Sequence, residues 1–192
     1  MSAEMGNSEE KAGRAGLRRH VTMPRVAFLL VILIILAVIL AYNSRATAPS
    51  ANKSSGAVNG PNLSLEPASQ RVLLSSSLAI KIWANTSGQK VNAVQVNLSY
   101  PIDKLNFVSV DSTNSAFGLS VKGEGANGKI TIARGSFQPV SGKLLVATVN
   151  FSGANSSGQA IVKFTNGTAL LNASTNRNIL AGTYDGNYTL TQ

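Results

Sequence analysis

Side chains suited to catalysis are few in this chain of 192 residues, which has no cysteine and a single histidine, His20. These counts exclude a thiol nucleophile, a zinc–thiolate site and a multi-histidine metal centre. Glycoside hydrolysis needs two carboxyl groups that face each other at a defined separation. The carboxylates after residue 61 all lie in or beside an expected turn or strand end, and they are Glu66, Asp103, Asp111, Glu124 and Asp185. We therefore expect no enzyme activity, no cofactor and no bound metal.

One tryptophan is a candidate for binding. The segment 78–84 (LAIKIWA) alternates between apolar residues and residues of mixed type, which predicts a half-buried strand. Trp83 then lies beside Lys81 on the face opposite Ile80 and Ile82. An exposed Trp suits a sugar ring or a protein partner, because its large apolar ring carries one polar group. Alternatively, Trp83 packs in the core or at an edge of the domain.

Strand-length segments fill the rest of residues 62–192, and none of them has a convincing helical period. Besides 78–84 and 94–100 they are 63–66, 107–111, 119–122, 129–134, 144–151, 160–164, 168–171, 180–184 and 187–190. Three of the junctions carry Asn127-Gly128, Asn166-Gly167 and Asp185-Gly186, which predict tight hairpins because a type I′ turn needs two residues of positive φ. Eight to ten short strands with two apolar faces to bury predict an all-β sandwich or jelly roll.

A membrane anchor is expected before this domain. The segment 26–42 (VAFLLVILIILAVILAY) is uncharged, and as a helix of about 25 Å it is just long enough to cross a bilayer. Basic residues crowd beside it in the tail 1–25, so the positive-inside rule places that tail, with His20, in the cytoplasm. The following segment, 43–61, is rich in Ser, Ala, Asn, Gly and Pro and is typical of a flexible linker, with a stalk of about 20 to 25 Å.

The alternative to a retained anchor is a cleaved signal peptide. Ala46-Thr47-Ala48 has the small-x-small spacing of a cleavage site, although the apolar run before it is longer than usual. We expect a single-pass cell-membrane protein with an extracellular domain at 62–192, or a secreted domain if cleavage follows Ala48. Net charge is +9. The basic residues of the domain form no cluster of the kind that marks a nucleic-acid groove, so we expect no nucleic-acid partner.

The segment 91–112 (VNAVQVNLSYPIDKLNFVSVDS) joins an alternating strand ending in Leu-Ser-Tyr to a short turn, a Leu and a second strand, Phe-Val-Ser-Val. This order resembles the cohesin domain, whose pattern is a strand ending in Leu-x-Tyr-Asp-Pro, then a Leu and a strand of the same type. The segment 142–151 (GKLLVATVNF) is similar to a later strand of the family, and 172–181 is similar to the loop before its last strand. Pro101 stands where the family usually has Asp, so the turn departs from the pattern.

The resemblance covers about residues 62–190 and implies a nine-stranded jelly-roll sandwich, preceded here by the membrane helix and linker. Cohesins bind dockerin modules and so assemble polysaccharide-degrading enzymes, and related modules bind polysaccharide directly. The resemblance also implies that dockerin contacts use the sheet face containing the strand that matches 94–100. The candidates on that face are the outward residues Gln95, Asn97 and Ser99, with Thr131 on a neighbouring strand. Alternatively, these are ordinary solvated positions.

Together these observations predict a membrane-anchored, extracellular and non-catalytic cohesin-like module. Its expected partner is a dockerin-type protein or a polysaccharide, which places it in polysaccharide catabolism. A polysaccharide-binding surface usually aligns several aromatic rings, and this domain offers Trp83 and scattered tyrosines, which favours protein recognition. The alternative is a structural cell-envelope or pilus-like surface protein that binds copies of itself.

Overall fold

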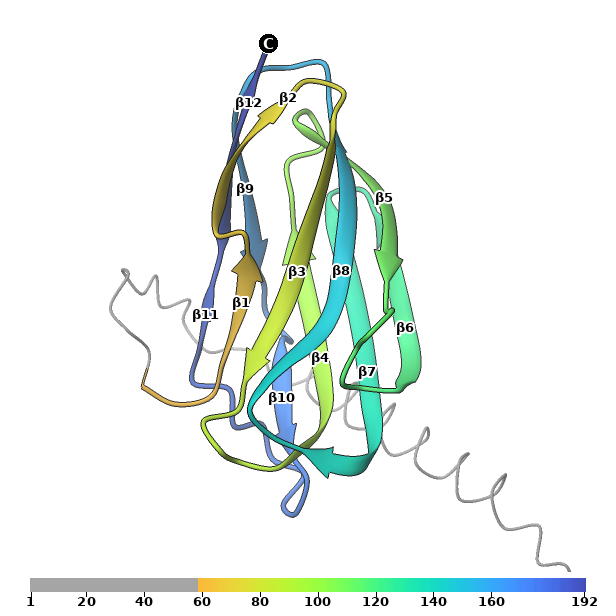
Figure 1. Ribbon diagram of the computed structural model, residues 1–192, viewed down its shortest axis with the longest axis vertical. Coiled ribbons are helices and arrows are strands. Elements are labelled where there is room, and N and C mark those ends of the chain that lie inside the picture. The colour runs from red at the N-terminus through yellow and green to blue at the C-terminus, as the bar shows by residue number, and fades with distance from the viewer. Residues whose placement is uncertain (1–58) are drawn as a thin grey trace, which may run out of the picture.

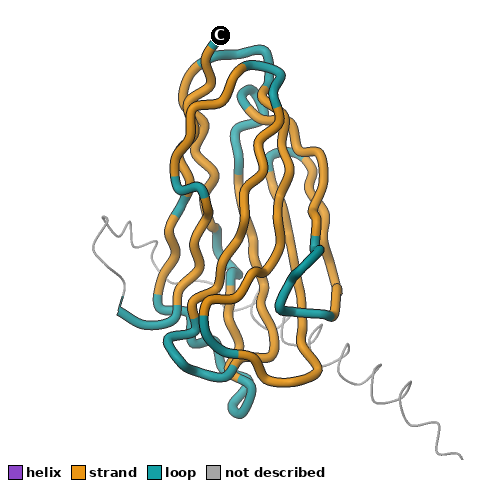
Figure 2. The backbone as a smooth tube through the Cα atoms, viewed as in Figure 1, coloured by secondary structure: helices purple, strands orange, loops and turns teal. Residues whose placement is uncertain are grey.

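The structure, a computed structural model, describes residues 59–192, which form twelve β-strands and no helix (Figures 1 and 2). The strands are β1 (Asn62–Glu66), β2 (Ser69–Leu73), β3 (Ser77–Asn85), β4 (Val91–Ser99), β5 (Leu105–Asp111), β6 (Leu119–Ala126), β7 (Lys129–Val140), β8 (Lys143–Gly153), β9 (Gly158–Phe164), β10 (Ala169–Asn172), β11 (Gly182–Tyr184) and β12 (Gly186–Thr191). The tail 1–25, the expected membrane helix 26–42 and most of the linker 43–61 lie outside the described residues. Among the residues that are described, none belongs to a helix that could span a membrane.

Two sheets pack face to face as a β-sandwich, as the alternating segments predict. The five-stranded sheet has the order β11-β1-β3-β8-β5 and faces the viewer in Figure 1. The seven-stranded sheet lies behind it in the order β2-β12-β9-β4-β7-β6, with β10 also paired to β4. Neighbouring strands are antiparallel except for the terminal pairs β1–β11 and β2–β12, which are parallel.

The core is made by the inward residues of both sheets. On β3 the side chains from Leu78 to Ala84 alternate as predicted, with every second residue buried, and the same is true of β4 from Val94 onward. Tyr100, just beyond β4, places its ring 5.2 Å from that of Phe151 in an edge-to-face contact. Burial of one face of each strand fixes the register, because a slip of one residue would expose the apolar set.

The prediction of about nine strands is wrong in detail, because three long strands are interrupted. The first strand divides at Pro67 into β1 and β2, which belong to different sheets, and the last divides at Asp185 into β11 and β12. The strand after β8 divides at 165–168 into β9 and β10. The sequence-based strands also omit β2, in which Val72 is the one buried residue and which therefore shows no alternation.

One of the three predicted hairpins is confirmed. Asn127 and Gly128 have φ values of 51° and 75° and join β6 to β7, which pair antiparallel. The other two predictions are wrong. At Asn166-Gly167 the flanking strands β9 and β10 each pair with β4 instead of with each other. At Asp185-Gly186 the chain passes from the five-stranded sheet to the seven-stranded sheet.

The two crossings close one long edge of the sandwich. Tyr188 of β12 is fully buried, and its hydroxyl donates to the carbonyl of Pro67 at 2.8 Å, between β1 and β2. Burial raises the pKa of Tyr188. A Cβ at Gly186 would overlap the Tyr188 hydroxyl, so this position accepts only glycine without a shift of the ring. The two terminal strands are thereby joined to each other in both sheets.

The opposite long edge is closed by the segment 112–118, between β5 and β6. Phe117 in this segment is fully buried, and its carbonyl accepts hydrogen bonds from the Nε and Nη2 of Arg134 at 3.0 and 2.7 Å. Arg134 follows Ile130 and Ile132 on the inward side of β7 and is 5% exposed. Burial lowers the pKa of its guanidinium. The same segment is attached to β8 by the backbone N–H of Ala116, which donates to the carbonyl of Leu145 at 2.9 Å.

The domain begins near the end of the sandwich at which β4 starts, and β4 ends toward the middle, since β9, β12 and β2 extend beyond its last residue. Asn62 pairs with Asn85 at the end of β3, next to the loop that leads into β4. β4 runs from this end toward Ser99, which pairs with Lys129 at the start of β7. In Figure 1 the start of β1 accordingly lies near the bottom and the C-terminus at the top. A tether attached before residue 62 therefore leaves the domain near the end at which β4 begins, and Ser99 lies several residues along the strands from it.

Candidate functional site

The outer face of the seven-stranded sheet is polar in its centre. Gln95, Asn97 and Ser99 alternate with buried apolar residues of β4 and are all partly exposed. Thr131 of β7 is the register partner of Asn97, so the two side chains lie beside each other on the same face. The sequence-based candidates on β4 and β7 thus form one continuous surface.

A local irregularity makes this surface concave. β4 pairs with β10 along its first half and with β9 at Leu98 and Ser99. The turn 165–168 lies between β9 and β10 and interrupts the regular pairing with β4. The Asn97 carbonyl accepts from the N–H of Thr165 at 2.8 Å, and the Asn97 N–H donates to Thr168 Oγ1 at 3.1 Å. Gly167, with φ of 83°, lets the turn close tightly. The bonds to Asn97 hold the turn beside β4 although the regular ladder is broken there.

A pocket of about 520 Å³ opens beside this turn. The Asn97 side chain lies at its wall and donates from Nδ2 to the carbonyl of Asn166 at 3.0 Å. The lining residues come from β4, β7 and the end of β9 with its turn, and they are Asn97, Leu98, Ser99, Lys129, Ile130, Thr131, Phe164, Thr165 and Asn166. The polar lining residues carry hydroxyls, amides and one ammonium, while Leu98 and Ile130 have their side chains buried in the core. Such a site suits recognition of a polar surface feature.

Two lysines flank Ser99 in the row of residues across the sheet. Ser99 is the register partner of Lys129 on β7 and of Lys163 on β9, and both lysines are exposed. The described part of the chain has three ion pairs, and neither of these lysines takes part in them. Asp185 precedes Gly186, the register partner of Val162, so it lies near Lys163, and its Oδ1 accepts the N–H of Phe164 at 2.9 Å. The row therefore has one cation on each side of Ser99, with the Asp185 carboxylate beyond Lys163.

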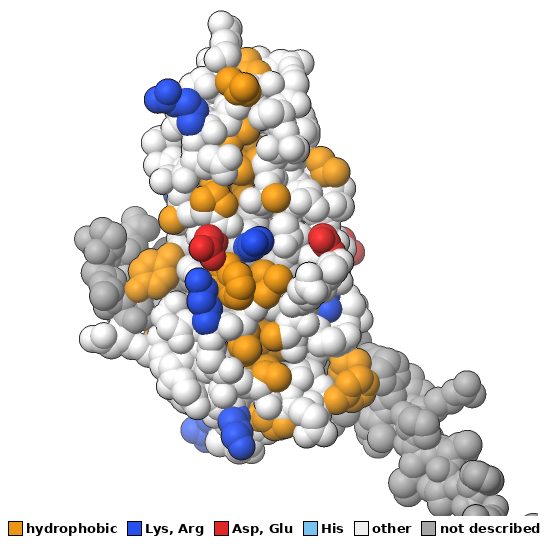
Figure 3. Space-filling model, in the orientation of Figure 1, with side chains coloured by type: hydrophobic (Ala, Val, Ile, Leu, Met, Phe, Trp, Pro, Cys, Tyr) orange, Lys and Arg blue, Asp and Glu red, His pale blue; other side chains and the backbone are white. Residues whose placement is uncertain are grey.

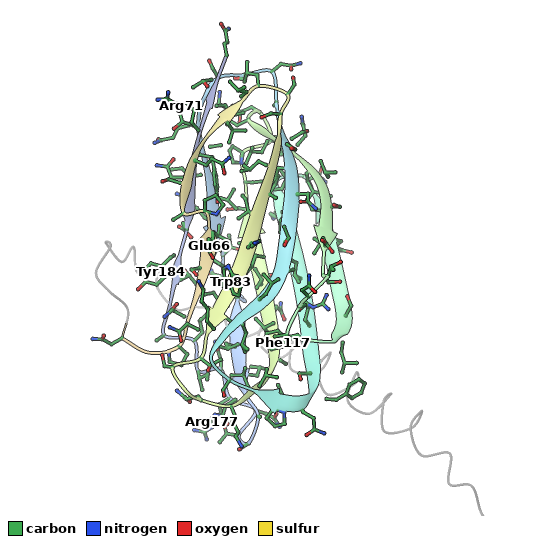
Figure 4. The ribbon with its side chains drawn as sticks, in the orientation of Figure 1. Glu66, Arg71, Trp83, Phe117, Arg177 and Tyr184 are labelled. Carbon is green, nitrogen blue, oxygen red and sulfur yellow. The ribbon has the colours of Figure 1, made fainter. Side chains whose placement is uncertain are left out.

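The outer face of the five-stranded sheet is different in character. Trp83 lies there half-buried, and Lys143 Nζ sits 4.7 Å from the centre of its ring. The same ammonium is 3.5 Å from a carboxylate oxygen of Glu66. Figure 3 shows hydrophobic side chains running down the middle of this face, and Figure 4 shows Trp83 close to Glu66 and Tyr184 on it. The indole ring is therefore covered by charged side chains of its own sheet.

The structure thus separates the five candidate residues into two groups. Asn97, Ser99 and Thr131 line the pocket, and Gln95 lies on the same face, opposite Ala133 of β7. Trp83 lies on the other sheet. Its Nε1 is buried without a hydrogen-bond partner, so its polar group does not face the solvent. The expectation that Trp83 is outward on its strand is correct, but it is not part of the pocket.

The sequence-based candidates include three of the nine residues that line the pocket, Asn97, Ser99 and Thr131. Lys129 comes directly after the Asn127-Gly128 turn, so the hairpin signal marks it as the start of a strand. In the structure this strand is β7, and Lys129 is the register partner of Ser99 at the end of β4. Phe164 and Thr165 come directly before a second Asn-Gly pair, Asn166-Gly167, for which the sequence predicts a hairpin. No sequence signal shows that the strands on both sides of that turn would pair with β4. Within residues 59–192, no three side chains of His, Cys, Asp or Glu gather closely enough to hold a metal ion.

No protein-family model matches this sequence, and no curated protein matches it by sequence. Solved structures do match the fold. A non-cellulosomal cohesin from the archaeon Archaeoglobus fulgidus has a TM-score of 0.57 at 16% identity, covering 70% of this chain and 93% of its own. The cohesin module of a Clostridium perfringens family 33 glycoside hydrolase has a TM-score of 0.58 at 14% identity, covering 69% and 97%.

A third similar structure contains a partner. It is the third cohesin ScaC from Acetivibrio cellulolyticus in complex with the ScaB dockerin, with a TM-score of 0.54 at 13% identity, covering 69% of this chain and 99% of that cohesin. All three cohesins are covered almost completely by residues of this chain. The described domain therefore has the cohesin fold.

Proposed function

We propose that this protein is a non-catalytic recognition module, held at the outer surface of the cell membrane, that binds a dockerin-type module. The observation that carries the proposal is the pocketed polar face of β4, β7 and β9 on a cohesin fold. In the cohesin family, dockerin contacts are expected on the face that includes the strand matching 94–100, and β4 is that strand. The similar structure from Acetivibrio cellulolyticus is itself a complex with a dockerin.

The dimensions of this face suit a folded protein partner. β4 has nine residues and is about 30 Å long, and five neighbouring strands span about 20 Å across the sheet. The flat area of this face, about 600 Å², is of the same order as the roughly 800 Å² of accessible surface that one partner buries in a typical specific complex. The polar residues at its centre can supply the directional hydrogen bonds that such an interface needs.

A polysaccharide is less well supported as the partner. Sugar rings are usually bound by stacking on exposed aromatic faces. The one aromatic side chain lining the pocket is Phe164, which packs partly against the core. Trp83, the other aromatic candidate, is covered by Lys143 on the opposite sheet.

Membrane attachment is the second part of the proposal and rests on the uncharged segment 26–42 and the basic residues before it. The chain enters the domain near the end at which β4 begins, and the pocket opens on the outer face of the seven-stranded sheet, several residues along the strands from that end. Sequencing the mature N-terminus tests the attachment. Cleavage after Ala48 would contradict a retained anchor.

The binding proposal is tested with the full-length protein in a non-ionic detergent. We expect it to retain at least one module from a panel of dockerins and to retain no neutral glycan from a parallel panel. Sedimentation at increasing concentration tests the competing function. Failure to bind any dockerin, together with reversible self-association, would replace the recognition module by a structural surface protein.

A further inference from the structure

We infer that the pocket selects an acidic protein surface, and that a carboxylate of the partner docks over Ser99 between Lys129 and Lys163. This inference rests on the proposed function and specifies the chemistry of its partner. It starts from the row of three residues across β7, β4 and β9, which are register partners on one face of the sheet.

The spacing of this row suits one carboxylate. Adjacent strands are about 4.8 Å apart, so the Cα atoms of Lys129 and Lys163 lie about 10 Å apart with Ser99 midway. Both side chains are long enough to turn their ammonium groups toward the centre, where the Ser99 hydroxyl is a further donor. An anion above Ser99 would therefore meet donors from three strands at once.

The lysines are available for a partner. Three lysines of the domain have a carboxylate within 4.0 Å: Lys122 is 2.7 Å from Glu124, Lys143 is 3.5 Å from Glu66, and Lys104 is 3.5 Å from Asp103. Within residues 59–192, Lys129 and Lys163 have no such pair, and what sets them apart from the other exposed cations without one is that they lie on the two sides of a single hydroxyl, Ser99. Their ammonium groups repel each other when both turn toward Ser99, and a partner's carboxylate relieves that repulsion.

The rest of the face adds to the same preference. By register, the cations on the outer side of the seven-stranded sheet also include Arg71 of β2, beside Thr189 of β12. Of the carboxylates near the pocket, Glu124 is paired with Lys122, and Asp185 accepts the N–H of Phe164 but keeps its negative charge. The preference for an anion therefore applies to the position over Ser99, between the two lysines, where a cation of the partner would be disfavoured.

An anionic polysaccharide is the competing ligand class. Its carboxylates would suit the two lysines, but its rings would need stacking surfaces, and the pocket is lined by one partly buried aromatic residue, Phe164. The hydroxyls and amides of Asn97, Thr131 and Thr165 instead match the side chains and backbone of a protein surface. We therefore assign the carboxylate to a protein.

Charge reversal tests the inference. We compare the full-length protein with the double variant Lys129→Glu/Lys163→Glu and with the control Lys90→Glu/Arg177→Glu, which changes net charge equally at exposed positions outside the pocket. The probes are a panel of dockerin modules of different surface charge, a 15-residue Glu-rich peptide, its Lys-rich counterpart and polygalacturonate. Affinities are measured at low and high salt.

We expect acidic probes to bind the wild-type protein and the control alike, and to bind the pocket variant at least about tenfold more weakly, with the difference shrinking at high salt. Equal binding by the pocket variant, or a preference for basic dockerins, would overturn the inference while leaving the dockerin proposal intact. Binding of polygalacturonate without the Glu-rich peptide would overturn it in favour of a glycan. Loss of all dockerin binding with selective capture of the Glu-rich peptide would uphold the inference and refute the proposed partner.

Discussion

The two outer faces of the sandwich differ in what surrounds their lysine side chains. On the five-stranded sheet, Lys143 covers the ring of Trp83 and is neutralised by Glu66. On the seven-stranded sheet, Lys129 and Lys163 remain without such partners beside an open pocket. Each face also has the opposite case, since exposed Lys81 on β3 has no carboxylate of residues 59–192 within 4.0 Å and Lys122 on β6 is paired with Glu124. The difference is that the seven-stranded face places two such lysines on the two sides of one hydroxyl, Ser99, beside a pocket. This contrast favours the proposed recognition on the seven-stranded sheet, although the only tryptophan lies on the other.

The largest expected effect comes from blocking the pocketed face. Replacing Gln95 and Asn97 together by Glu adds two negative charges to the centre of that face, which repel an acidic partner, and we expect at least about 100-fold weaker binding of an acidic dockerin, or about 2.7 kcal/mol. The matched variant Ser77→Glu/Ala79→Glu places the same residues at exposed positions of β3 on the five-stranded sheet. Calorimetric titration measures the affinity of both variants for the dockerin. Equal affinities would contradict the contrast between the two faces.

The next effect concerns stability and the opposite face. Trp83→Ala removes a half-buried ring and its contact with Lys143, so we expect unfolding free energy to fall by about 2 kcal/mol without a change in partner affinity. Trp83→Phe keeps most of the ring and removes the Nε1–H that is buried without a partner, so it should be nearly neutral. Urea denaturation measures both. A loss of affinity in Trp83→Phe would show that this face also takes part in binding.

A smaller effect is expected at the rim of the pocket. Gly167 has φ of 83°, so Gly167→Ala forces a side chain into a left-handed conformation and should cost about 1 kcal/mol of stability. The turn holds Thr165 and Asn166 at the pocket, and its distortion should also weaken partner binding a few-fold. Gly88, with φ of 80° in the loop before β4, is the control, because it should show the stability loss alone.

The smallest effect is expected from the ion pair on the five-stranded sheet. Glu66→Gln leaves Lys143 over the Trp83 ring but removes its carboxylate partner at 3.5 Å. Both groups are exposed, so unfolding free energy should change by less than about 1 kcal/mol and less still at high salt. Thermal melts at two salt concentrations test this. A salt-independent change would mean that Glu66 acts through packing.

Sequence reasoning reached the sandwich and the polar strand through alternation. Because β3 and β4 are buried on one side, apolar and polar residues alternate along them with a period of two. The same alternation is expected in any sheet that has one solvent-exposed face. β2 carries no such signal, because Val72 is its only buried residue and its place is set by parallel pairing with β12. Pairing between distant segments depends on the whole sheet and cannot be seen in a short window.

The pocket was less predictable than the strand that forms its wall. Asn97 and Ser99 follow from alternation, but the hollow beside them exists because β4 exchanges one neighbour, β10, for another, β9. The Asn166-Gly167 pair signals a turn and says nothing of which strand its flanks will join. The distinction between the two faces likewise depends on which lysines find carboxylates, and Lys143 and Glu66 are far apart in the sequence.

The pairing of the first strand decides how the domain would bear a pull. A partner held near Ser99 and a tether attached before Asn62 would pull on two points that are separated along the strands, so part of the force would act along the axis of β1. β1 lies between β3 and β11 and pairs with β3 from Asn62 to Glu66 and with β11 from Asn62 to Ser64. A force along β1 would shear both ladders at once, so their hydrogen bonds would have to break together instead of one by one. The arrangement gives the domain its resistance in the direction in which a surface-bound load would act.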